Sequence, residues 1–362
     1  KLDYLKNLGV NAVELLPIME FSGNQSWGYN PNFYLAPDKA YGTPDAYRRF
    51  IDECHKRGMA VILDIVFNHV DGRHPWYNMY PGISTKFFNA NGSAPHAWSV
   101  FNDWKQEYDL VEMHFEDALK YWITEFKADG FRFDLVKGLG YNDSYNNPTY
   151  NAATNQWGNP SNLDALTSAF NASRVARMKA LHDAVRTVKP DAYMINENLA
   201  GVQEENDMAR DQELNWANVN YASCQFAMGF ESGAGLSRFY APSDGGRLWG
   251  STVSYAESHD EERLAAKIMA YATDNVKTAT VRAARLGATG VWMILSPGPK
   301  MLWQFQELGN EESTKNADGS NNTDPKTVRW NDLDNAVRQR ILEAYRIPVI
   351  EIEGFEADDV IS

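Results

Sequence analysis

The chain alternates between short apolar runs and longer segments in which apolar residues recur every three or four positions. Short apolar runs bounded by turn residues predict buried strands, and the longer periodic segments predict helices. The predicted strands are residues 11–18, 59–67, 130–136, 191–196, 218–226, 251–257 and 300–305. The predicted helices are residues 2–8, 44–57, 114–127, 173–187, 275–286 and 336–347.

This repeated alternation predicts an α/β fold with a parallel sheet. A doubly wound sheet and a closed (β/α)8 TIM barrel both fit the order of elements. The barrel is favoured because polar side chains follow several separate strands, and barrel enzymes gather their functional groups at the C-terminal ends of strands. Only seven strands are predicted and the sequence opens inside a predicted helix, so we expect the first barrel strand to precede Lys1.

A long polar and aromatic stretch after the strand at residues 59–67 predicts an insert in the barrel. We therefore predict three parts: residues 1–69 as the first part of the barrel, residues 70–113 as the insert, and residues 114–362 as the remainder. Two further polar stretches, residues 142–162 and 310–324, are expected to be loops, the second of them solvated.

The composition limits the classes of partner. The net charge is −14, which argues against nucleic acid or an anionic membrane surface as the main partner. No apolar run approaches the ~20 residues that span a bilayer. The two cysteines, Cys54 and Cys224, form no CxxC pair, so neither a zinc site nor a disulfide framework is predicted. Nothing in the sequence determines the oligomeric state.

Ionisable and polar side chains gather where four of the predicted strands end. They are Asn68 and His69, Arg132 and Asp134, Glu197, and His259 and Asp260. Each group alone has a structural interpretation: an internal ion pair, a helix-capping acid or an exposed turn. Taken together they favour a functional site, because independent capping acids have no reason to occupy the same edge of one sheet.

Three carboxyl groups in one place indicate either a divalent metal site or glycoside hydrolysis. Side chains alternate along a strand, so Arg132 and Asp134 share one face. A cation there opposes a metal ion and favours a carboxylate that stays ionised, as a nucleophile requires. Its partner acid must stay protonated in a less polar setting, and Glu197 is the best candidate.

Four segments then carry a family resemblance: DIVFNH, GFRFDLVKG, MINEN and ESHD, in that order along the chain. They resemble the four signature regions of glycoside hydrolase family 13, the α-amylase family. The segments WGYNPNFYLAPDKAYGT and KMLWQFQELG resemble two further conserved stretches of that family, and the resemblance covers about residues 1–347. It implies a (β/α)8 barrel with a loop domain, domain B, after the third strand, and here that domain is short.

The resemblance implies a role for each acid. Asp134 would be the nucleophile, Glu197 the general acid/base, and Asp260 would bind the hydroxyl groups of the reacting glucose. Substrate contacts are implied for Tyr29, His69, Arg132, Lys137 and His259. Among these, Tyr29 would stack on the sugar, Arg132 would hold Asp134 ionised, and Lys137 would contact the sugar on the leaving-group side.

No cofactor is implied, although many family members bind calcium. Asn68 matches a calcium ligand of the family. Gly138, however, stands where many members carry a histidine whose backbone carbonyl helps to bind that ion. Ser258 similarly stands where asparagine is common. We therefore expect either no metal or calcium at Asn68.

The function expected from the resemblance is retaining hydrolysis of α-1,4 bonds in starch- or glycogen-type glucans by double displacement. Hydrolysis of α-1,6 bonds, as in pullulanases, and glucan transfer, as in branching enzymes, remain alternatives. A non-catalytic glucan-binding protein is a third alternative, but such members usually lose one of the three acids, and all three are present here. A polymeric substrate favours an extracytoplasmic location.

Overall fold

The computed structural model describes residues 1–79, 84–90, 92–330, 341 and 345. Seven parallel strands form one curled sheet, and their order in the sheet is their order in the chain. They are β1 (Ala12–Leu15), β4 (Ala60–Ile65), β7 (Gly130–Phe133), β8 (Tyr193–Asn196), β9 (Leu214–Asn218), β10 (Thr252–Tyr255) and β11 (Lys300–Met301). A doubly wound sheet would reverse its strand order at a switch point, so this order identifies a partial (β/α)8 barrel.

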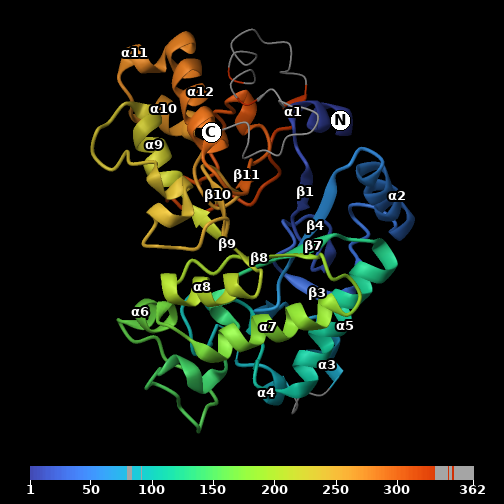
Figure 1. The fold of residues 1–362 in the computed structure, drawn as a ribbon. Helices are drawn as coiled ribbons and strands as arrows, with labels where there is room; N and C mark the ends of the chain where they lie inside the picture. The colour runs from blue at the N-terminus through green and yellow to red at the C-terminus, as the bar shows by residue number, and fades with distance from the viewer. Residues whose placement is uncertain (80–83, 91, 331–340, 342–344, 346–362) are drawn as a thin grey trace.

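The described strands leave this barrel open between β1 and β11, because β1 pairs only with β4, and β11 pairs only with β10. Helix α1 (Leu2–Leu8) makes a contact across the gap. The Tyr4 hydroxyl donates a hydrogen bond to Glu307 Oε1 at 2.9 Å, beyond the end of β11. Figure 1 shows α1 at the same end of the molecule as α12.

Three helices cover the outer face of β4, β7 and β8. They are α2 (Pro44–His55), α5 (Asp109–Phe126) and α7 (Ala172–Arg186). Thr43 and Asn171 cap α2 and α7 by accepting backbone N–H groups, as N-cap residues do. Together these helices and strands form the first core, which includes Leu63, Phe131 and Trp122.

A second core lies on the other side of the molecule (Figure 1). It is formed around α9 (Asn220–Met228), α10 (Leu264–Tyr271) and α12 (Ala279–Leu295). The lumen of the barrel has its own apolar layer, which consists of Ile62, Ile195, Trp216, Val253 and Tyr255.

The remaining elements are short. The helices are α3 (Pro75–Met79), α4 (Ser84–Phe87), α6 (Leu163–Ser168), α8 (Val202–Arg210) and α11 (Asp274–Lys277). Two antiparallel pairs join β2 (Met19–Phe21) to β3 (Pro31–Pro37), and β5 (His69–Val70) to β6 (Asn102–Asp103). The elements α3, α4 and β6 lie in the stretch predicted as an insert, and α5 begins at Asp109. No helix in the described part of the chain is both long and apolar enough to cross a membrane.

Several predicted elements differ from the structure. The predicted strand at 218–226 is wrong: the strand ends at Asn218, and the following residues form α9. The predicted strand at 300–305 is confirmed only for its first two residues, and the helix predicted at 275–286 is divided between α11 and α12. The helix predicted at 336–347 lies outside the described residues, apart from positions 341 and 345.

Candidate active site

The buried side chain of Arg132 is the centre of the site. The strands β4 and β7 pair in register, with Asp64 opposite Arg132. Arg132 Nη1 donates to both carboxylate oxygens of Asp64 and to Asp134 Oδ1, each at 2.9 Å. Its Nη2 lies 2.8 Å from Glu197 Oε2, an ion pair that lacks the alignment of a hydrogen bond. One guanidinium therefore contacts three carboxylates from three adjacent strands.

A strained turn after β7 fixes the position of Glu197 relative to Asp134. Leu135 has φ = 43°, a left-handed conformation that is rare for a residue with a branched side chain. This turn aims the Leu135 N–H at Glu197 Oε2, at 2.9 Å, and the Val136 N–H at the Glu197 backbone oxygen, at 3.0 Å. Backbone strain of this kind is typical of functional sites.

The protonation of this cluster differs from the prediction. Burial raises the pKa of Asp134 well above its usual value, and the charge of Arg132 only opposes this effect. Arg132 does lower this pKa, as expected, but burial outweighs its charge, so the net shift is upward. Burial also raises the pKa of Asp64 to about 6 and that of Glu14 to about 8. With one cation among four acids, the cluster retains protons at neutral pH.

Glu14 was missed by sequence reasoning. It lies on β1 opposite Ile62, whose side chain belongs to the lumen layer, and the charges of Asp64 and Glu197 act on it. A single acid inside an otherwise apolar strand, NAVELLPI, was the available signal. The β4 strand carries the same kind of signal, a single acid, Asp64, among apolar residues.

Asp260 lies at the edge of the site and is held by a loop that was expected to be solvated. Its Oδ1 accepts a hydrogen bond from Asn321 Nδ2 at 2.6 Å, and the Lys315 ammonium donates to its backbone oxygen. Its Oδ2 is 3.2 Å from His259 Nε2. Because burial lowers the pKa of His259 to about 3, this imidazole is neutral. The Asp260 side chain is still 42% exposed, so it can meet a ligand.

The structure brings most of the predicted sugar-binding residues together. The Tyr29 ring stacks on His259, with centroids 5.0 Å apart, and its hydroxyl donates to Asp64 at 2.6 Å. His69 Nε2 donates to the Tyr29 backbone oxygen at 2.8 Å. Lys137 stands to one side, where its ammonium donates to Ser168 Oγ at 3.0 Å. Contacts of these side chains with a sugar stay predictions.

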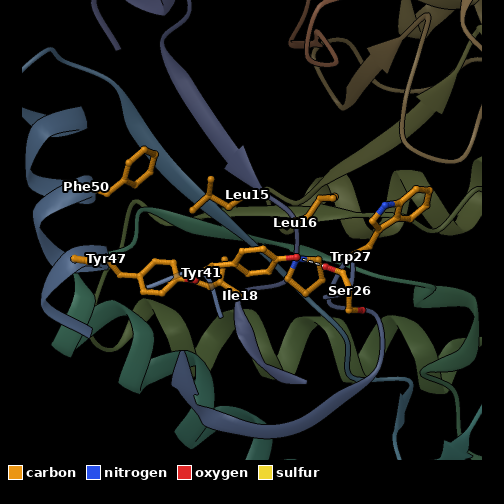
Figure 2. Close-up of a pocket in the computed structure, with 10 residues that line it drawn as sticks. Leu15, Leu16, Ile18, Ser26, Trp27, Tyr41, Tyr47 and Phe50 are labelled. Carbon is orange, nitrogen blue, oxygen red and sulfur yellow. Dashed lines mark hydrogen bonds between the residues drawn. The ribbon is translucent and has the colours of Figure 1, made fainter. Parts of the chain in front are cut away.

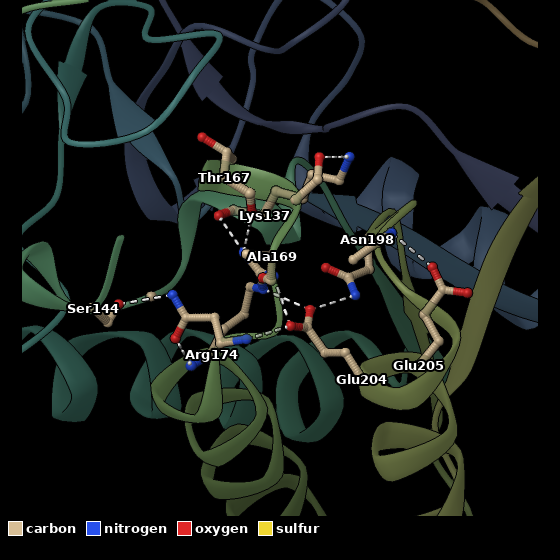
Figure 3. Close-up of polar contacts among 12 residues, drawn as sticks. Lys137, Ser144, Thr167, Ala169, Arg174, Asn198, Glu204 and Glu205 are labelled. Carbon is tan, nitrogen blue, oxygen red and sulfur yellow. Dashed lines mark hydrogen bonds and ion pairs between the residues drawn. The ribbon is translucent and has the colours of Figure 1, made fainter. Parts of the chain in front are cut away.

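A buried ion pair links the loops that follow β7 and β8 (Figure 3). Arg174 Nη2 and Nε each lie 2.7 Å from an oxygen of Glu204, and Arg174 also donates to the backbone oxygens of Lys137, Thr167 and Ala169. Glu204 Oε1 in turn accepts a hydrogen bond from Asn198, the residue after Glu197. The network therefore fixes the backbone on both sides of the acid pair.

The residues around Asn68 do not fit calcium, which prefers six to eight oxygen ligands. Asn68 Oδ1 is buried without a hydrogen-bond partner, as a cation ligand could be, but it packs against Gly138. A Cβ atom at Gly138 would lie 1.7 Å from that oxygen. The nearby carboxylate, Asp103, is engaged by His96 Nε2 at 3.0 Å and by Asn89 Nδ2 at 2.6 Å.

The His96 ring lies next to both Asp103 and Gly138. Its Nδ1 lies 2.7 Å from the Ala97 backbone oxygen, so both ring nitrogens already face oxygen atoms of the protein. Its Cε1 would lie 3.0 Å from a Cβ at Gly138. Within the described ranges, no three His, Cys, Asp or Glu side chains are grouped to hold a metal. Among the described residues, the calcium ligand predicted at Asn68 therefore has no His, Cys, Asp or Glu partners grouped to complete a site.

An apolar pocket of about 380 Å³ lies beside the site rather than in it. Figure 2 shows Leu15, Tyr41, Tyr47 and Phe50 around this pocket, between β1 and α2. Trp27 also lines the pocket, and the edge of its ring packs against His259, with centroids 5.4 Å apart. None of the four carboxylates around Arg132 lines it, so the chemistry lies elsewhere.

The fold is a partial (β/α)8 barrel, and one arginine bridges two carboxyl groups at the C-terminal ends of adjacent strands. These features place the chain among barrel proteins whose site is equipped for acid–base or nucleophilic chemistry. A family model described as "Alpha amylase, catalytic domain" matches residues 1–89 and 96–342. The chain therefore belongs to the α-amylase catalytic-domain family, as its motifs predicted.

Curated relatives are similar over part of the chain. Malto-oligosyltrehalose trehalohydrolase of Saccharolobus solfataricus is 40% identical over 140 residues, which are 38% of this chain and 24% of the relative. Pullulanase of Bacillus subtilis is 36% identical over 155 residues, or 37% of this chain and 21% of the relative. The 1,4-α-glucan branching enzyme of Oleidesulfovibrio alaskensis is 33% identical over 178 residues, which are 48% of this chain and 27% of the relative. The chain thus spans about a quarter of the length of these relatives.

Solved structures match nearly the whole chain. The α-amylase of Geobacillus thermoleovorans in complex with acarbose has a TM-score of 0.63 at 18% identity, covering 96% of this chain and 71% of that one. Pullulanase type I of Bacillus subtilis in complex with maltose has a TM-score of 0.67 at 21% identity, and the match covers 94% of this chain and 50% of that one. At these identities the likeness shows the fold alone, and it agrees with the predicted barrel.

Proposed function

We propose that this chain carries the catalytic centre of a retaining glycosidase that cleaves α-1,4 bonds in α-glucans. The observation that carries the proposal is the single guanidinium that contacts Asp134 and Glu197, at 2.9 and 2.8 Å. Retaining glycosidases hold their two carboxyl groups about 5–5.5 Å apart, and inverting ones about 6.5–9.5 Å apart. A bridge of one guanidinium favours the shorter separation. The names of the curated relatives support a glucan as substrate.

In the proposed mechanism, Glu197 protonates the glycosidic oxygen while Asp134 attacks the anomeric carbon. The bond to the leaving sugar breaks and a β-linked glycosyl-enzyme forms at Asp134. Glu197, now ionised, takes a proton from water, and the water oxygen displaces Asp134 to release a product of retained α configuration. The attack requires Asp134 to be ionised, and the charge of Arg132 favours that form against the effect of burial. Asp260 holds the hydroxyl groups of the reacting glucose.

The Leu135 N–H has a specific role in this mechanism. It binds Glu197 Oε2, and within the described part of the chain no hydrogen bond holds Oε1. The proton to be donated can therefore reside on Oε1 and face the glycosidic oxygen. Asp134 Oδ1 is bound by Arg132, so an attacking oxygen of Asp134 is held in a fixed direction.

The test is hydrolysis of amylose and of pullulan by the chain and by its Asp134→Asn variant. We expect the chain to release oligosaccharides of α configuration from amylose, as seen by NMR, and the variant to lose at least about 10³-fold in kcat. The matched control is Asp191→Asn, an exposed acid in an ion pair with Lys189, which should keep full activity. Unchanged turnover by Asp134→Asn, or products of β configuration, would contradict the proposal.

Cleavage of α-1,6 bonds or glucan transfer is the second candidate, favoured by the similarity to a pullulanase and a branching enzyme. Preferential cleavage of pullulan, or the appearance of longer or branched products from amylose, would select it. A polymeric substrate also supports an extracytoplasmic location for the protein. Fractionation of cells that express the complete gene tests this location.

A further inference from the structure

Glu261 is an acid of the site to which the proposed mechanism gives no role. It follows Asp260 in the segment after β10, and its side chain is half-buried. Burial raises the pKa of Glu261 to about 7, and the negative charges of Asp260 and Glu197 act in the same direction. Glu261 therefore lies close enough to both acids to interact with their charges, and it titrates near neutral pH.

Both carboxyl oxygens of Glu261 accept hydrogen bonds. Oε1 accepts from Asn218 Nδ2, at the end of β9, and Oε2 accepts from the Ser258 hydroxyl, after β10. The Asn218 amide cannot turn over freely, because its Oδ1 accepts the Asn220 N–H at 2.9 Å. Protonation of Glu261 puts a hydrogen on one of two oxygens that each face a donor, so it breaks or reverses one of these bonds.

Ser258 carries this arrangement to Asp260. The hydroxyl gives its proton to Glu261, so its oxygen faces the Asp260 N–H and accepts from it at 3.1 Å. The loop that binds the Asp260 side chain through Asn321 is also fastened here, because the Thr314 hydroxyl donates to the Glu261 backbone oxygen at 2.8 Å. Glu261 thus connects the end of β9, the segment after β10 and this loop around one acid.

We propose that Glu261 is a positioning residue for Asp260: the ionised carboxylate orients Ser258 and thereby holds Asp260 where it binds the reacting glucose. The inference rests on the proposed function, which gives Asp260 its place at that sugar. When Glu261 is protonated, Ser258 or Asn218 turns and the Asp260 backbone loses a fixed contact. Because the pKa of Glu261 is about 7, the positioning of Asp260 is complete above this pH and is lost below it.

Ionisable groups from other segments also face Glu261. The charges of Glu197, which follows β8, and of Asp260 raise its pKa, whereas the Lys315 ammonium lowers it. The phenol of Tyr255, on β10, is buried, and burial raises its pKa so far that it stays neutral. Since Glu197 itself changes its protonation in the proposed reaction, the test needs a variant that abolishes only the titration of Glu261.

The experiment measures kcat/KM for maltopentaose across the pH range in the unaltered chain and in Glu261→Gln, because this quantity reports the pKa values of the free enzyme. Glutamine has the shape of the protonated acid and cannot ionise, so it mimics the low-pH state at every pH. We expect Glu261→Gln to lower kcat/KM about three- to tenfold near pH 8, the effect of one hydrogen bond, and less than about twofold near pH 5.5. The ratio of the two enzymes should change with a midpoint near pH 7.

A second variant, Ser258→Ala, tests the path of the effect. It removes the hydroxyl between Glu261 and the Asp260 N–H, so near pH 8 it should cause a loss similar to that of Glu261→Gln. Adding Glu261→Gln to Ser258→Ala should then lower kcat/KM by less than about twofold more, because the two side chains act as one unit. Fully additive losses would contradict the path through Ser258.

The matched control is Glu125→Gln, the same substitution at an exposed acid near the end of α5, and its ratio to the unaltered chain should stay near one at every pH. A loss by Glu261→Gln that is equal at every pH would indicate a merely structural role and overturn the inference, as would no loss at alkaline pH. An unaltered chain that cleaves no glucan at any pH would overturn the proposed function, and this inference with it.

Discussion

Replacing Arg132 by methionine tests whether the charge of this one side chain stabilises the buried acid cluster, and with it the fold. Asp64 is 1% exposed, and its carboxylate would lose its charged partner. Breaking a buried ion pair by removing one partner costs about 3–5 kcal/mol. At roughly 2 °C per kcal/mol for a large domain, the melting temperature of Arg132→Met should fall by roughly 6–10 °C. Activity should be lost with it, because Asp134 and Glu197 lose their common partner.

The pH dependence of this loss follows from proton uptake. The pKa of Asp64 is about 6 with Arg132 present, and removing the cation raises it further. A carboxyl group whose folded pKa is raised contributes stability below its unfolded pKa and loses it as pH rises through the folded pKa. The deficit of Arg132→Met should therefore be smaller at pH 5 than at pH 8.

Urea and thermal unfolding at both pH values measure the effect. Adding Asp64→Asn to Arg132→Met should recover about 2 kcal/mol at pH 8, because it removes the unpaired charge but keeps an acceptor for the Tyr29 hydroxyl. The control, Arg210→Met, breaks a surface pair with Asp207 and should cost under about 1 kcal/mol. A wild-type melting temperature for Arg132→Met, or a deficit that grows at low pH, would refute the reasoning.

Three further outcomes are expected. Gly138→Ala should lower stability by about 1–3 kcal/mol, since its Cβ would overlap Asn68, whereas Gly201→Ala, where a Cβ meets nothing within 4 Å, should be near neutral in urea unfolding. Addition of calcium or of EDTA should change neither the melting temperature nor turnover. A calcium-dependent rise in either quantity would contradict the conclusion that the residues around Asn68 and His96 do not fit calcium. Burial raises the pKa of Glu213 to about 8, so Glu213 should contribute a loss of stability between about pH 4.5 and 8, and Glu213→Gln should remove that contribution in thermal unfolding.

The sequence predicts the fold where strands are continuous apolar runs. The strand that contains Asp64 and the strand that contains Arg132 are read correctly because their outward-facing residues are all apolar. The β9 strand, LNWAN, was missed because its polar residue Asn215 is buried and donates to the Glu205 backbone oxygen, a tertiary contact without a local signal. The following segment has β-favouring aromatic residues but buries Ser223, Cys224 and Ala227 at helical spacing.

The sequence predicts which acids form the candidate site but not how their pKa values are shifted. The positions of Asp134, Glu197 and Asp260 follow from strand ends. The rise in the pKa of Asp134 depends on burial and on the nearby charges of Glu197 and Asp64, which no local pattern reveals.

The two packing units of the barrel divide the acids between them. Asp134 and Glu197 belong to strands of the first core, while Asp260 follows β10, next to Ala256 of the second core. The units are joined at β8 and β9, where only two residue pairs are in register. The lumen layer packs across this junction, because it joins Ile62 and Ile195 to Trp216, Val253 and Tyr255. The position of Asp260 relative to the Arg132-bridged pair therefore depends on the packing of this layer, and a cavity created there would displace one acid from the other two.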